Sequence, residues 1–461
     1  MSRLVVVSNR VAVPDDQAAR AGGLAVALRE ALQNYGGIWF GWSGKITATS
    51  ATEPRIIEHP PVTYAVVDLG RKDYNEYYNG FANRTLWPLF HYRMSLAEFN
   101  RGNYAGYLRV NALFAEQLRP LLEPDDTIWI HDYHILPLGK ELRRLGANNR
   151  MGIFLHTPFP AMEVLLALPS HARLARSLCS YDIVGFQTEN DRRSFNDYIL
   201  HEARGEILGN DMVRAYGRTF KAKVYPIGIE KGVMAQTSMM SSKTAAYRRL
   251  EKSLGGRKLM IGVDRLDYSK GLPERMEAYQ RFLEKFPQHR NEVSFMQIAP
   301  LSRSEVPEYK AIRQQLETMS GNINGRYGDF DWTPVRYLTK NFQRNVLAGF
   351  FRQAQVGVVT PMRDGMNLVA KEYVASQNPQ DPGMLVLSRF AGAARELESA
   401  LLVNPYDRED VADAMDRALT MSLDERKERW TEMMRIVDEQ SLETWRNTFL
   451  DDLSKAPFST P

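Results

Sequence analysis

Cysteine is almost absent from this chain of 461 residues, whose only thiol belongs to Cys179. One thiol can form neither an internal disulfide framework nor a cysteine-ligated metal cluster, and it fits a reducing compartment. Long apolar runs are missing as well. The run at residues 4–7 stops at polar residues, and neither it nor any later run is long enough for a signal peptide or a membrane span. We therefore expect a cytoplasmic protein with no membrane partner.

A large charge excess and the common cofactor motifs are also missing. The net charge is only +4, and no basic run is interleaved with aromatic residues, so nucleic acid is not an expected partner. The sequence contains neither the GxGxxG spacing of a dinucleotide site nor a P-loop, which argues against a dehydrogenase and an NTPase. It also lacks HExxH and has no Asp-x-Asp motif at a strand end. We expect no metal and no cofactor.

Short apolar runs rich in Val, Ile and Phe alternate with amphipathic stretches, which is typical of buried parallel strands joined by helices. A chain of this length exceeds one hydrophobic core, so the pattern predicts an α/β protein with two doubly wound, Rossmann-like domains. The first series of strands is expected at 4–8, 38–42, 64–68, 127–131, 152–156, 183–187 and 223–227. The second is expected at 259–263, 293–299, 335–338, 356–360, 384–387 and 401–403.

The domain boundary is predicted near Gly228, because residues 229–256 lack strand character and contain a Gly-Gly step. We expect residues 1–228 to form an N-terminal domain and residues 229–461 a C-terminal domain. Residues 408–455 read as nearly continuous helix, whose apolar stripe predicts core packing and a return onto the first domain. The weakly patterned residues 43–62 are expected to be a surface excursion.

Polar residues stand at the carboxyl ends of several predicted strands, where open α/β sheets bind ligands. In the first half these are Ser8-Asn9-Arg10 and the two histidine-bearing segments around Asp132 and His156. An aspartate there can accept a hydrogen bond from a sugar hydroxyl, and an imidazole can donate one. Gly22 and Gly23 open an amphipathic helix, where free N–H groups can approach a phosphate, although a plain turn explains them equally well.

Two strand ends in the second half carry charged loops. Arg265 and Lys270, five residues apart between a strand and a helix, can grip the two phosphates of a diphosphate. Near residue 364 we expect Gly365, Met366, Asn367 and Leu368 to form the first helical turn, with N–H groups facing phosphate. Asp364 before this turn can hold hydroxyls of a transferred sugar, and Glu372 one turn later can accept both hydroxyls of a ribose.

The long motifs AGGLAVAL, LWPLFHYR, WIHDYH, FLHTPFP, RLDYSKGLPER and TPMRDGMNLVAKE give the chain a specific family resemblance. Together with EYYN, GFQTEND, YPIGIE, IAPLSR and VNPYDRE, they resemble the bacterial trehalose-6-phosphate synthases, and the similarity runs nearly end to end. The resemblance implies a GT-B fold of two facing Rossmann-like domains. It also implies a retaining glucosyltransferase that moves glucose from UDP-glucose to glucose-6-phosphate and needs no metal.

The resemblance implies roles for individual residues, the donor being held mainly by the second domain and the acceptor mainly by the first. The implied catalytic groups are Asp132, His156, Arg265, Lys270 and Asp364, with His156 reaching the transferred glucose. The other implied donor contacts are Gly22, Gly23, Phe342, Gly365, Met366, Asn367, Leu368, Val369 and Glu372. The implied acceptor contacts are Arg10, Tyr78, Trp87 as an aromatic wall, Asp132 and Arg303.

Three alternatives stay open at this point. The same fold and loops could serve another acceptor, such as glycerol 3-phosphate, or an ADP-glucose donor, because contacts to the nucleotide base are commonly backbone groups. A nucleotide-sugar-binding regulator without catalysis is a third alternative, although none of the motif residues that we placed is replaced in this chain. The sequence also leaves a homo-oligomer open.

Overall fold

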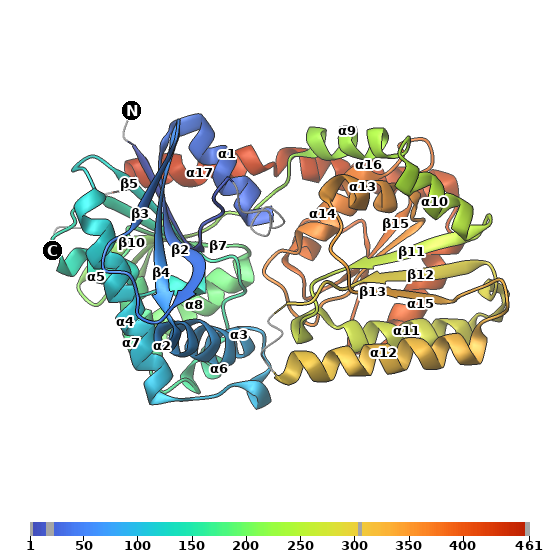
Figure 1. Ribbon diagram of the computed structural model, residues 1–461, viewed down its shortest axis with the longest axis horizontal. Coiled ribbons are helices and arrows are strands. Elements are labelled where there is room, and N and C mark those ends of the chain that lie inside the picture. Colours follow the sequence, from blue (N-terminus) through green and yellow to red (C-terminus); the bar gives the residue numbers. More distant parts are fainter. Residues whose placement is uncertain (1–2, 15–22, 303–306, 457–461) are drawn as a thin grey trace. The chain divides into compact units, whose positions relative to one another are not determined.

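The structure is a computed structural model that describes residues 3–14, 23–302 and 307–456 (Figure 1). The chain divides into two compact units. Unit 1 comprises Met1–Pro226 and Trp445–Pro461, and unit 2 comprises Ile227–Thr444. Each unit contains one mainly parallel sheet with helices, which confirms the expected α/β class.

Unit 1 is built on a ten-stranded sheet with the order β3-β4-β2-β1-β5-β6-β7-β10-β9-β8. The strands from β4 to β10 pair in parallel, and β3, β9 and β8 are antiparallel additions at the edges. The strands are β1 (Leu4–Arg10), β2 (Gly37–Thr47), β3 (Arg55–His59), β4 (Val62–Gly70), β5 (Thr127–His131), β6 (Arg150–Phe154), β7 (Ile183–Phe186), β8 (Glu206–Gly209), β9 (Met212–Ala215) and β10 (Arg218–Val224).

The helical segments of unit 1 include a long π-helix, η2 (Tyr74–Leu86), a type that is frequent at functional sites. The others are α1 (Gly23–Tyr35), α2 (Arg71–Asp73), α3 (Trp87–Phe90), η3 (Met94–Leu96), α4 (Arg101–Leu118), η4 (Arg119–Leu121), η5 (Tyr133–Ile135), α5 (Leu138–Arg144), α6 (Met162–Leu166), α7 (His171–Leu178), α8 (Glu189–His201) and, from Trp445 onward, α17 (Leu442–Lys455).

Unit 2 is built on a six-stranded, fully parallel sheet with the order β13-β12-β11-β14-β15-β16. Its strands are β11 (Lys258–Val263), β12 (Val293–Ile298), β13 (Val335–Leu338), β14 (Val356–Val359), β15 (Met384–Ser388) and β16 (Leu401–Val403). Its helices are α9 (Lys231–Ser241), α10 (Ala245–Leu254), η6 (Tyr268–Lys270), α11 (Leu272–Lys285), η7 (Pro287–His289), α12 (Pro307–Tyr327), α13 (Arg344–Gln353), α14 (Leu368–Ser376), η8 (Gly392–Arg395), α15 (Arg408–Thr420) and α16 (Leu423–Glu439).

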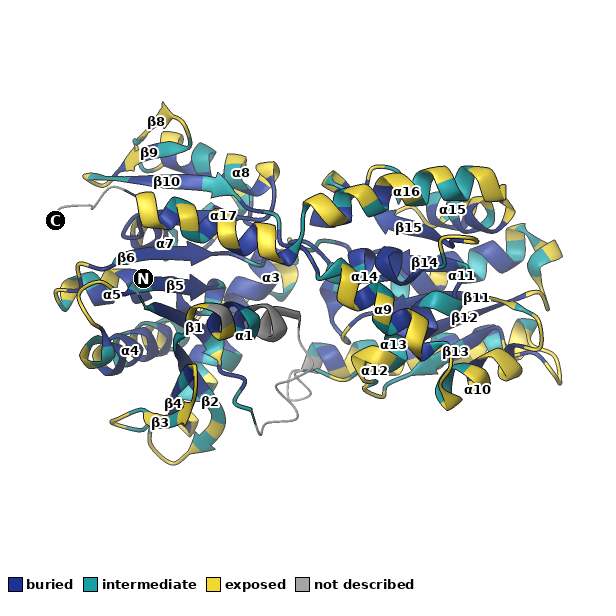
Figure 2. Cartoon of the chain, turned by 90° about the horizontal axis from the view of Figure 1, so that it is seen from above, coloured by how far each residue is buried: buried dark blue, intermediate teal, exposed yellow. Residues whose placement is uncertain are grey.

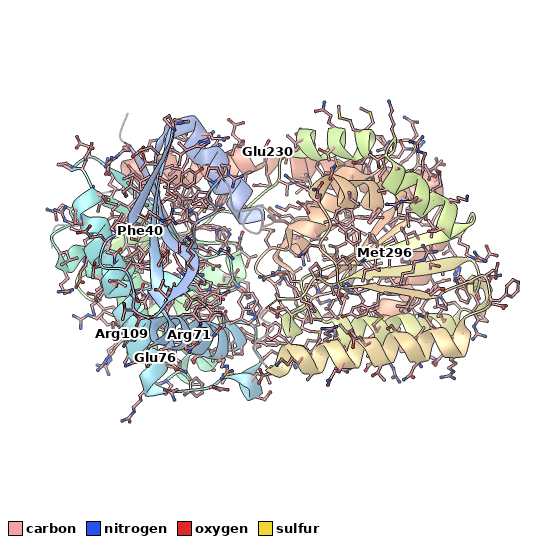
Figure 3. The ribbon with its side chains drawn as sticks, in the orientation of Figure 1. Phe40, Arg71, Glu76, Arg109, Glu230 and Met296 are labelled. Carbon is pink, nitrogen blue, oxygen red and sulfur yellow. The ribbon has the colours of Figure 1, made fainter. Side chains whose placement is uncertain are left out.

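Helices cover both faces of the parallel strands, so the strands read as continuous apolar runs rather than alternating ones. Val5, Val6 and Val7 of β1 are all fully buried, and Figure 2 shows similar burial along the central strands of both sheets. Phe40 on β2 and Met296 on β12, labelled in Figure 3, belong to these two cores. Among the described residues, no helix has both the length and the apolar character that crossing a bilayer requires.

Each sheet reverses its strand order at one point. In unit 1 the chain builds outward from β1 through β2 and β4, and then restarts on the other side of β1 with β5. In unit 2 it builds from β11 through β12 and β13, and then restarts beside β11 with β14. Loops that leave two such strands diverge and leave a crevice at the carboxyl edge of the sheet. Among the predicted site residues, Asp132 and His156 follow β5 and β6 in unit 1, and Arg265, Lys270 and Asp364 follow β11 and β14 in unit 2.

Two sequence-based predictions about strands were wrong. Residues 43–62 are not merely a surface excursion, because β2 continues to Thr47 and β3 pairs antiparallel to β4. The strand expected at 223–227 lies earlier, as β10, because it pairs with the short hairpin strand β9. The nearly continuous helix expected at 408–455 is confirmed as three successive helices, with short breaks after Thr420 and after Glu439. Ser422 caps the start of α16.

Candidate active site

Asp132 lies at the switch point of unit 1, directly after β5. Its backbone has φ 76° and ψ 172°, a conformation that non-glycine residues rarely adopt and that is found mostly at functional positions. The carboxylate Oδ1 accepts hydrogen bonds from the backbone N–H groups of His156 and Thr157, at 3.2 and 3.3 Å. Burial raises the pKa of Asp132 to about 6 despite these bonds. The strained backbone thus fixes a carboxyl group that changes charge near neutral pH.

His156 is held beside this carboxyl group by a second histidine. The Nδ1 atom of His131, the last residue of β5, lies 3.2 Å from Nε2 of His156. Burial lowers the pKa of His156 to about 3, and burial together with the His156 ring lowers the pKa of His131 well below its ordinary value. Both imidazoles are therefore neutral near pH 7, and each has one donor nitrogen and one acceptor nitrogen.

The predicted acceptor residues of unit 1 divide between surface and core. Tyr78 of η2 is half-buried and stacks on His134, with ring centroids 5.8 Å apart, and it also contacts Trp42. Trp87 is only 6% exposed and packs against Tyr133, so it belongs to the core rather than to the surface.

Arg10 is exposed at the end of β1, where its guanidinium group lies against the backbone of Gly44. Arg303 lies outside the described residues, and so does Gly22. Gly23 is the first residue of α1, as the sequence predicted.

The switch point of unit 2 brings Lys270 and Asp364 together from two different loops. Lys270 Nζ forms an ion pair with Asp364 Oδ2, and both side chains are largely buried. Lys270 ends the short helix η6, and Gly271 follows it with φ 63°. A Cβ atom at Gly271 would lie 2.5 Å from the carbonyl oxygen of Thr360, so only glycine lets the two loops approach.

The loop before α14 differs from its sequence-based prediction. Gly365, Met366 and Asn367 are not a helical turn, because Asn367 adopts the left-handed conformation and α14 starts at Leu368. Asn367 Nδ2 donates to Asp364 Oδ2 at 3.0 Å, so the carboxylate receives bonds from both Lys270 and Asn367. Leu368 and Val369 still form the first turn of α14, where N–H groups lack intrahelical acceptors and favour an anion.

Glu372 lies one turn into α14, and its Oε1 atom is 3.4 Å from Nη2 of Arg344. Burial raises the pKa of this carboxyl group, and the guanidinium group of Arg344 opposes this rise. Phe342, two residues before Arg344, is half-buried and makes an edge contact with Phe350. Arg265 is exposed on the loop after β11.

Arg275 on α11 is the main supporting residue that the sequence-based prediction missed. Its side chain is fully buried, and it donates to Asp264 Oδ2 at 2.8 Å, Thr360 Oγ1 at 2.9 Å and Gln297 Oε1 at 2.9 Å. A fourth bond, of 3.3 Å, reaches the carbonyl of Lys270. The guanidinium thus joins the loops after β11 and β14. The sequence nevertheless indicates such a network, because Asp264 directly follows an apolar strand. A carboxylate that is buried at this position needs a cation as partner.

The described part of the chain contains no group of three or more His, Cys, Asp or Glu side chains that could hold a metal ion. Unit 2 instead presents a lysine and a helix start, which suit an anionic group that gains charge. Unit 1 presents a carboxyl, neutral imidazoles and aromatic faces, which suit a polyhydroxylated ligand.

Comparison with known proteins agrees with this chemistry. The model of glycosyltransferase family 20 matches residues 2–455. A trehalose-6-phosphate synthase of Enterobacter sp. (strain 638) is 52% identical over 457 residues, covering 99% of this chain and 96% of the relative.

Two of the solved structures that are similar to this chain were determined with a bound ligand. A UDP-forming alpha,alpha-trehalose-phosphate synthase from Burkholderia xenovorans, in complex with glucose-6-phosphate, is 50% identical with a TM-score of 0.95, covering 98% of this chain and 100% of that one. An Escherichia coli structure bound with UDP-2-fluoro glucose is also 50% identical with a TM-score of 0.95, and the match covers 100% of both chains.

Proposed function

Because the chain belongs to glycosyltransferase family 20, we propose that it transfers glucose from UDP-glucose to glucose-6-phosphate, giving alpha,alpha-trehalose-6-phosphate and UDP. The observation that carries this proposal is the switch point of unit 2, where Lys270, Asp364 and the start of α14 meet. A cation beside a helix start suits the diphosphate of a nucleotide-sugar, and Asp364 suits the hydroxyls of its glucose. The relatives' bound glucose-6-phosphate and UDP-glucose analogue support the two substrates.

We assign the nucleotide-sugar mainly to residues of unit 2 and the acceptor mainly to residues of unit 1. In unit 2, Arg265 and Lys270 bind the diphosphate with the N–H groups of Leu368 and Val369, and Glu372 binds the ribose. Phe342 and the loop 365–367 complete the donor contacts, together with Gly22 and Gly23 of unit 1. In unit 1, Asp132 accepts from an acceptor hydroxyl, and His156 donates to the transferred glucose. Arg10 of unit 1 and Arg303, whose sequence position belongs to unit 2, bind the acceptor phosphate, and Tyr78 forms its aromatic side together with the mostly buried Trp87.

The proposed reaction retains the configuration at the sugar carbon. The bond from this carbon to the departing phosphate oxygen breaks, and a bond to the acceptor hydroxyl oxygen forms on the same face. The hydroxyl proton passes to the departing phosphate oxygen, so no carboxylate nucleophile is required. A glycosidase would instead need two carboxyl groups about 5–10 Å apart across the bond. Lys270 and Arg265 stabilise the charge that grows on the leaving diphosphate.

Release of the nucleoside diphosphate, UDP or ADP according to the donor, is measured in a two-by-two assay that tests the function. The purified chain is given UDP-glucose or ADP-glucose as donor, each with glucose-6-phosphate or glycerol 3-phosphate as acceptor. We expect the highest kcat/KM for UDP-glucose with glucose-6-phosphate, and a phosphorylated disaccharide as product. Higher kcat/KM with glycerol 3-phosphate would reassign the acceptor. Nucleotide-sugar binding without turnover in all four combinations would indicate a regulator.

Activity is expected to be independent of divalent metal ions, because cationic side chains and a helix start are available to offset the leaving charge. Turnover should be unchanged after dialysis against EDTA and should not rise when magnesium or manganese is added. A loss on chelation that either ion restores would overturn the assignment of the diphosphate to Lys270 and Arg265.

The raised pKa of Asp132 predicts a pH dependence. The group is neutral below its pKa of about 6 and a carboxylate above it, and the carboxylate is the stronger acceptor for a sugar hydroxyl. We expect kcat/KM for glucose-6-phosphate to rise between about pH 5 and about pH 7. The acceptor phosphate also titrates near pH 6, so the control is Asp132→Asn, which retains only the titration of the phosphate. Profiles of identical shape for the two proteins would exclude Asp132 from this role.

Glu372→Ala is expected to raise the KM for the nucleotide-sugar about tenfold or more with a smaller effect on kcat. Its carboxylate is assigned to the ribose, remote from the bond that breaks, and uniform binding of that kind appears in KM. The change also leaves Arg344 without its partner, so Arg344→Ala serves as control. An equal rise in KM for both variants would assign the effect to the ion pair rather than to ribose binding.

A further inference from the structure

A cluster of rings lies behind His156 in unit 1. His131 and Trp129 come from β5, and Trp445 comes from α17, which lies along the strands of this sheet (Figure 2). The ring centroid of Trp129 is 4.5 Å from that of His131 and 4.8 Å from that of Trp445. The Trp445 ring in turn lies 6.2 Å from His131 and 6.0 Å from His156. Both indoles and His131 are buried, so the cluster is a single packed group.

Three nitrogens of this cluster have no hydrogen-bond partner among the described residues. They are Nε2 of His131, Nε1 of Trp129 and Nε1 of Trp445, and all three are buried. Indole nitrogens carry a hydrogen and can only donate, whereas Nε2 of a neutral histidine can donate or accept. A buried polar group without a hydrogen-bond partner destabilises the fold. Because the two indole N–H groups can only donate, the protonation state in which His131 Nε2 is an acceptor is favoured.

This requirement selects one of two arrangements of the histidine pair. In the first, His131 Nδ1 carries the proton and donates to His156 Nε2, which leaves His131 Nε2 as an acceptor for the indoles. In the second, His156 Nε2 donates to His131 Nδ1, and His131 Nε2–H becomes a third buried donor beside two others. The first arrangement gives the two indole donors an acceptor that they can share through one bridging water, whereas the second gives them none. It also places the proton of His156 on Nδ1.

We propose that His131 is a positioning residue that holds His156 in its Nδ1–H tautomer, and that Trp129 and Trp445 fix this choice through their indole N–H groups. His156 then presents a hydrogen-bond donor, which suits a hydroxyl oxygen of the transferred sugar. This consequence rests on the proposed function, whereas the tautomer itself does not. Because Trp445 belongs to α17, this helix helps to determine which nitrogen of His156 carries the proton.

The tautomers can be read directly in the substrate-free protein. The full chain is labelled with ¹⁵N-histidine, and two-bond ¹H–¹⁵N correlation spectra are recorded near pH 8, where both rings are neutral. His131→Gln and His156→Gln assign the signals. We expect both rings in the Nδ1–H form. An Nε2–H signal for His156 in the unmodified chain would overturn the proposal.

Phenylalanine variants test the role of the indoles, because they keep an aromatic ring and remove only the N–H group. The double variant Trp129→Phe with Trp445→Phe should convert His156 from one tautomer to a mixture. The matched control is Trp430→Phe, whose indole donates to the carbonyl of Val374 in unit 2, and it should leave both histidine spectra unchanged. An unchanged tautomer in the double variant would show that the indoles do not set it.

Kinetics then separate positioning from a purely structural role. His131→Phe cannot donate to His156 and should lower kcat/KM for the nucleotide-sugar about tenfold, the effect of one neutral hydrogen bond. His131→Gln has an amide N–H and should recover most of this loss. Equal losses in the two variants would contradict positioning by donation. If the tautomer is as expected but the unmodified chain transfers no glucose, the proposed function fails and the assignment of the tautomer stands.

Discussion

Lys270→Ala is expected to lower kcat roughly 100-fold with saturating acceptor and donor, the scale of losing one preorganised electrostatic group. The diphosphate gains negative charge as the sugar bond breaks, so the interaction with Lys270 strengthens in the transition state, and such interactions appear in kcat. The structure adds a second reason. The ammonium group also pairs with Asp364, the carboxylate assigned to the transferred sugar, so the variant loses a positioning contact as well.

Steady-state kinetics with both substrates varied measure this effect. Lys270→Arg keeps the charge but not the compact geometry of an ammonium, and it should recover only part of the loss. Asp364→Asn breaks the ion pair and keeps the lysine, so it separates the effect on the leaving group from the positioning effect. If Lys270→Ala raises only the donor KM and leaves kcat unchanged, the lysine binds the donor without stabilising the leaving group.

Arg275→Met is expected to destabilise unit 2 by about 3–5 kcal/mol, because it leaves Asp264 buried without its cation. The side chain of Arg275 is fully buried and that of Asp264 is 2% exposed, so solvent cannot replace the lost interaction. Burial already raises the pKa of Asp264, and the guanidinium opposes that rise, so the isolated acid should take up a proton. Chemical denaturation followed by circular dichroism measures the change.

Arg281→Met is the matched control on the same helix. Arg281 pairs with Glu409 at a partly exposed position, and such pairs contribute about 1 kcal/mol or less. The double variant Asp264→Leu with Arg275→Met removes both charges and should recover part of the lost stability. Equal destabilisation by Arg275→Met and Arg281→Met would mean that the buried network is not what holds the loops after β11 and β14.

The strands that position the site could be predicted because they are buried on both faces. Residues 127–131, for example, are expected and observed with the same bounds, and nearly all of them are buried. The carboxyl-end rule then brings Lys270 and Asp364 to one sheet edge, although they lie 94 positions apart, and the ion pair confirms that they meet. The structure likewise joins Asp132 to the backbone of His156 from two neighbouring strands.

The remaining features depend on tertiary contacts that no local pattern encodes. Arg275 stands on the buried face of α11, between Leu272 and Tyr279, but its charge gives no local reason for burial. Only the approach of Asp264 and Thr360 supplies its partners. Asn367 interrupts the expected helical turn because its side chain bonds to Asp364, which favours a conformation that asparagine tolerates. The strand β3 was missed because its residues are mostly exposed and belong to an edge.

Helix α17 packs on the sheet of unit 1, although unit 2 separates it from this sheet in the sequence. Phe449 packs against Gly152 and Gly185, where any larger residue would collide with its ring, and Asp452 accepts from Lys221, Lys223 and Tyr225 at 2.8 Å each. The polypeptide thus leaves unit 1 after Pro226 and re-enters it at Trp445. During synthesis, the sheet of unit 1 is made before unit 2 and α17 after it, so this sheet must wait for α17, although domains generally fold from the N-terminus as they emerge. Unit 1 can therefore become complete only after the whole of unit 2 has been made.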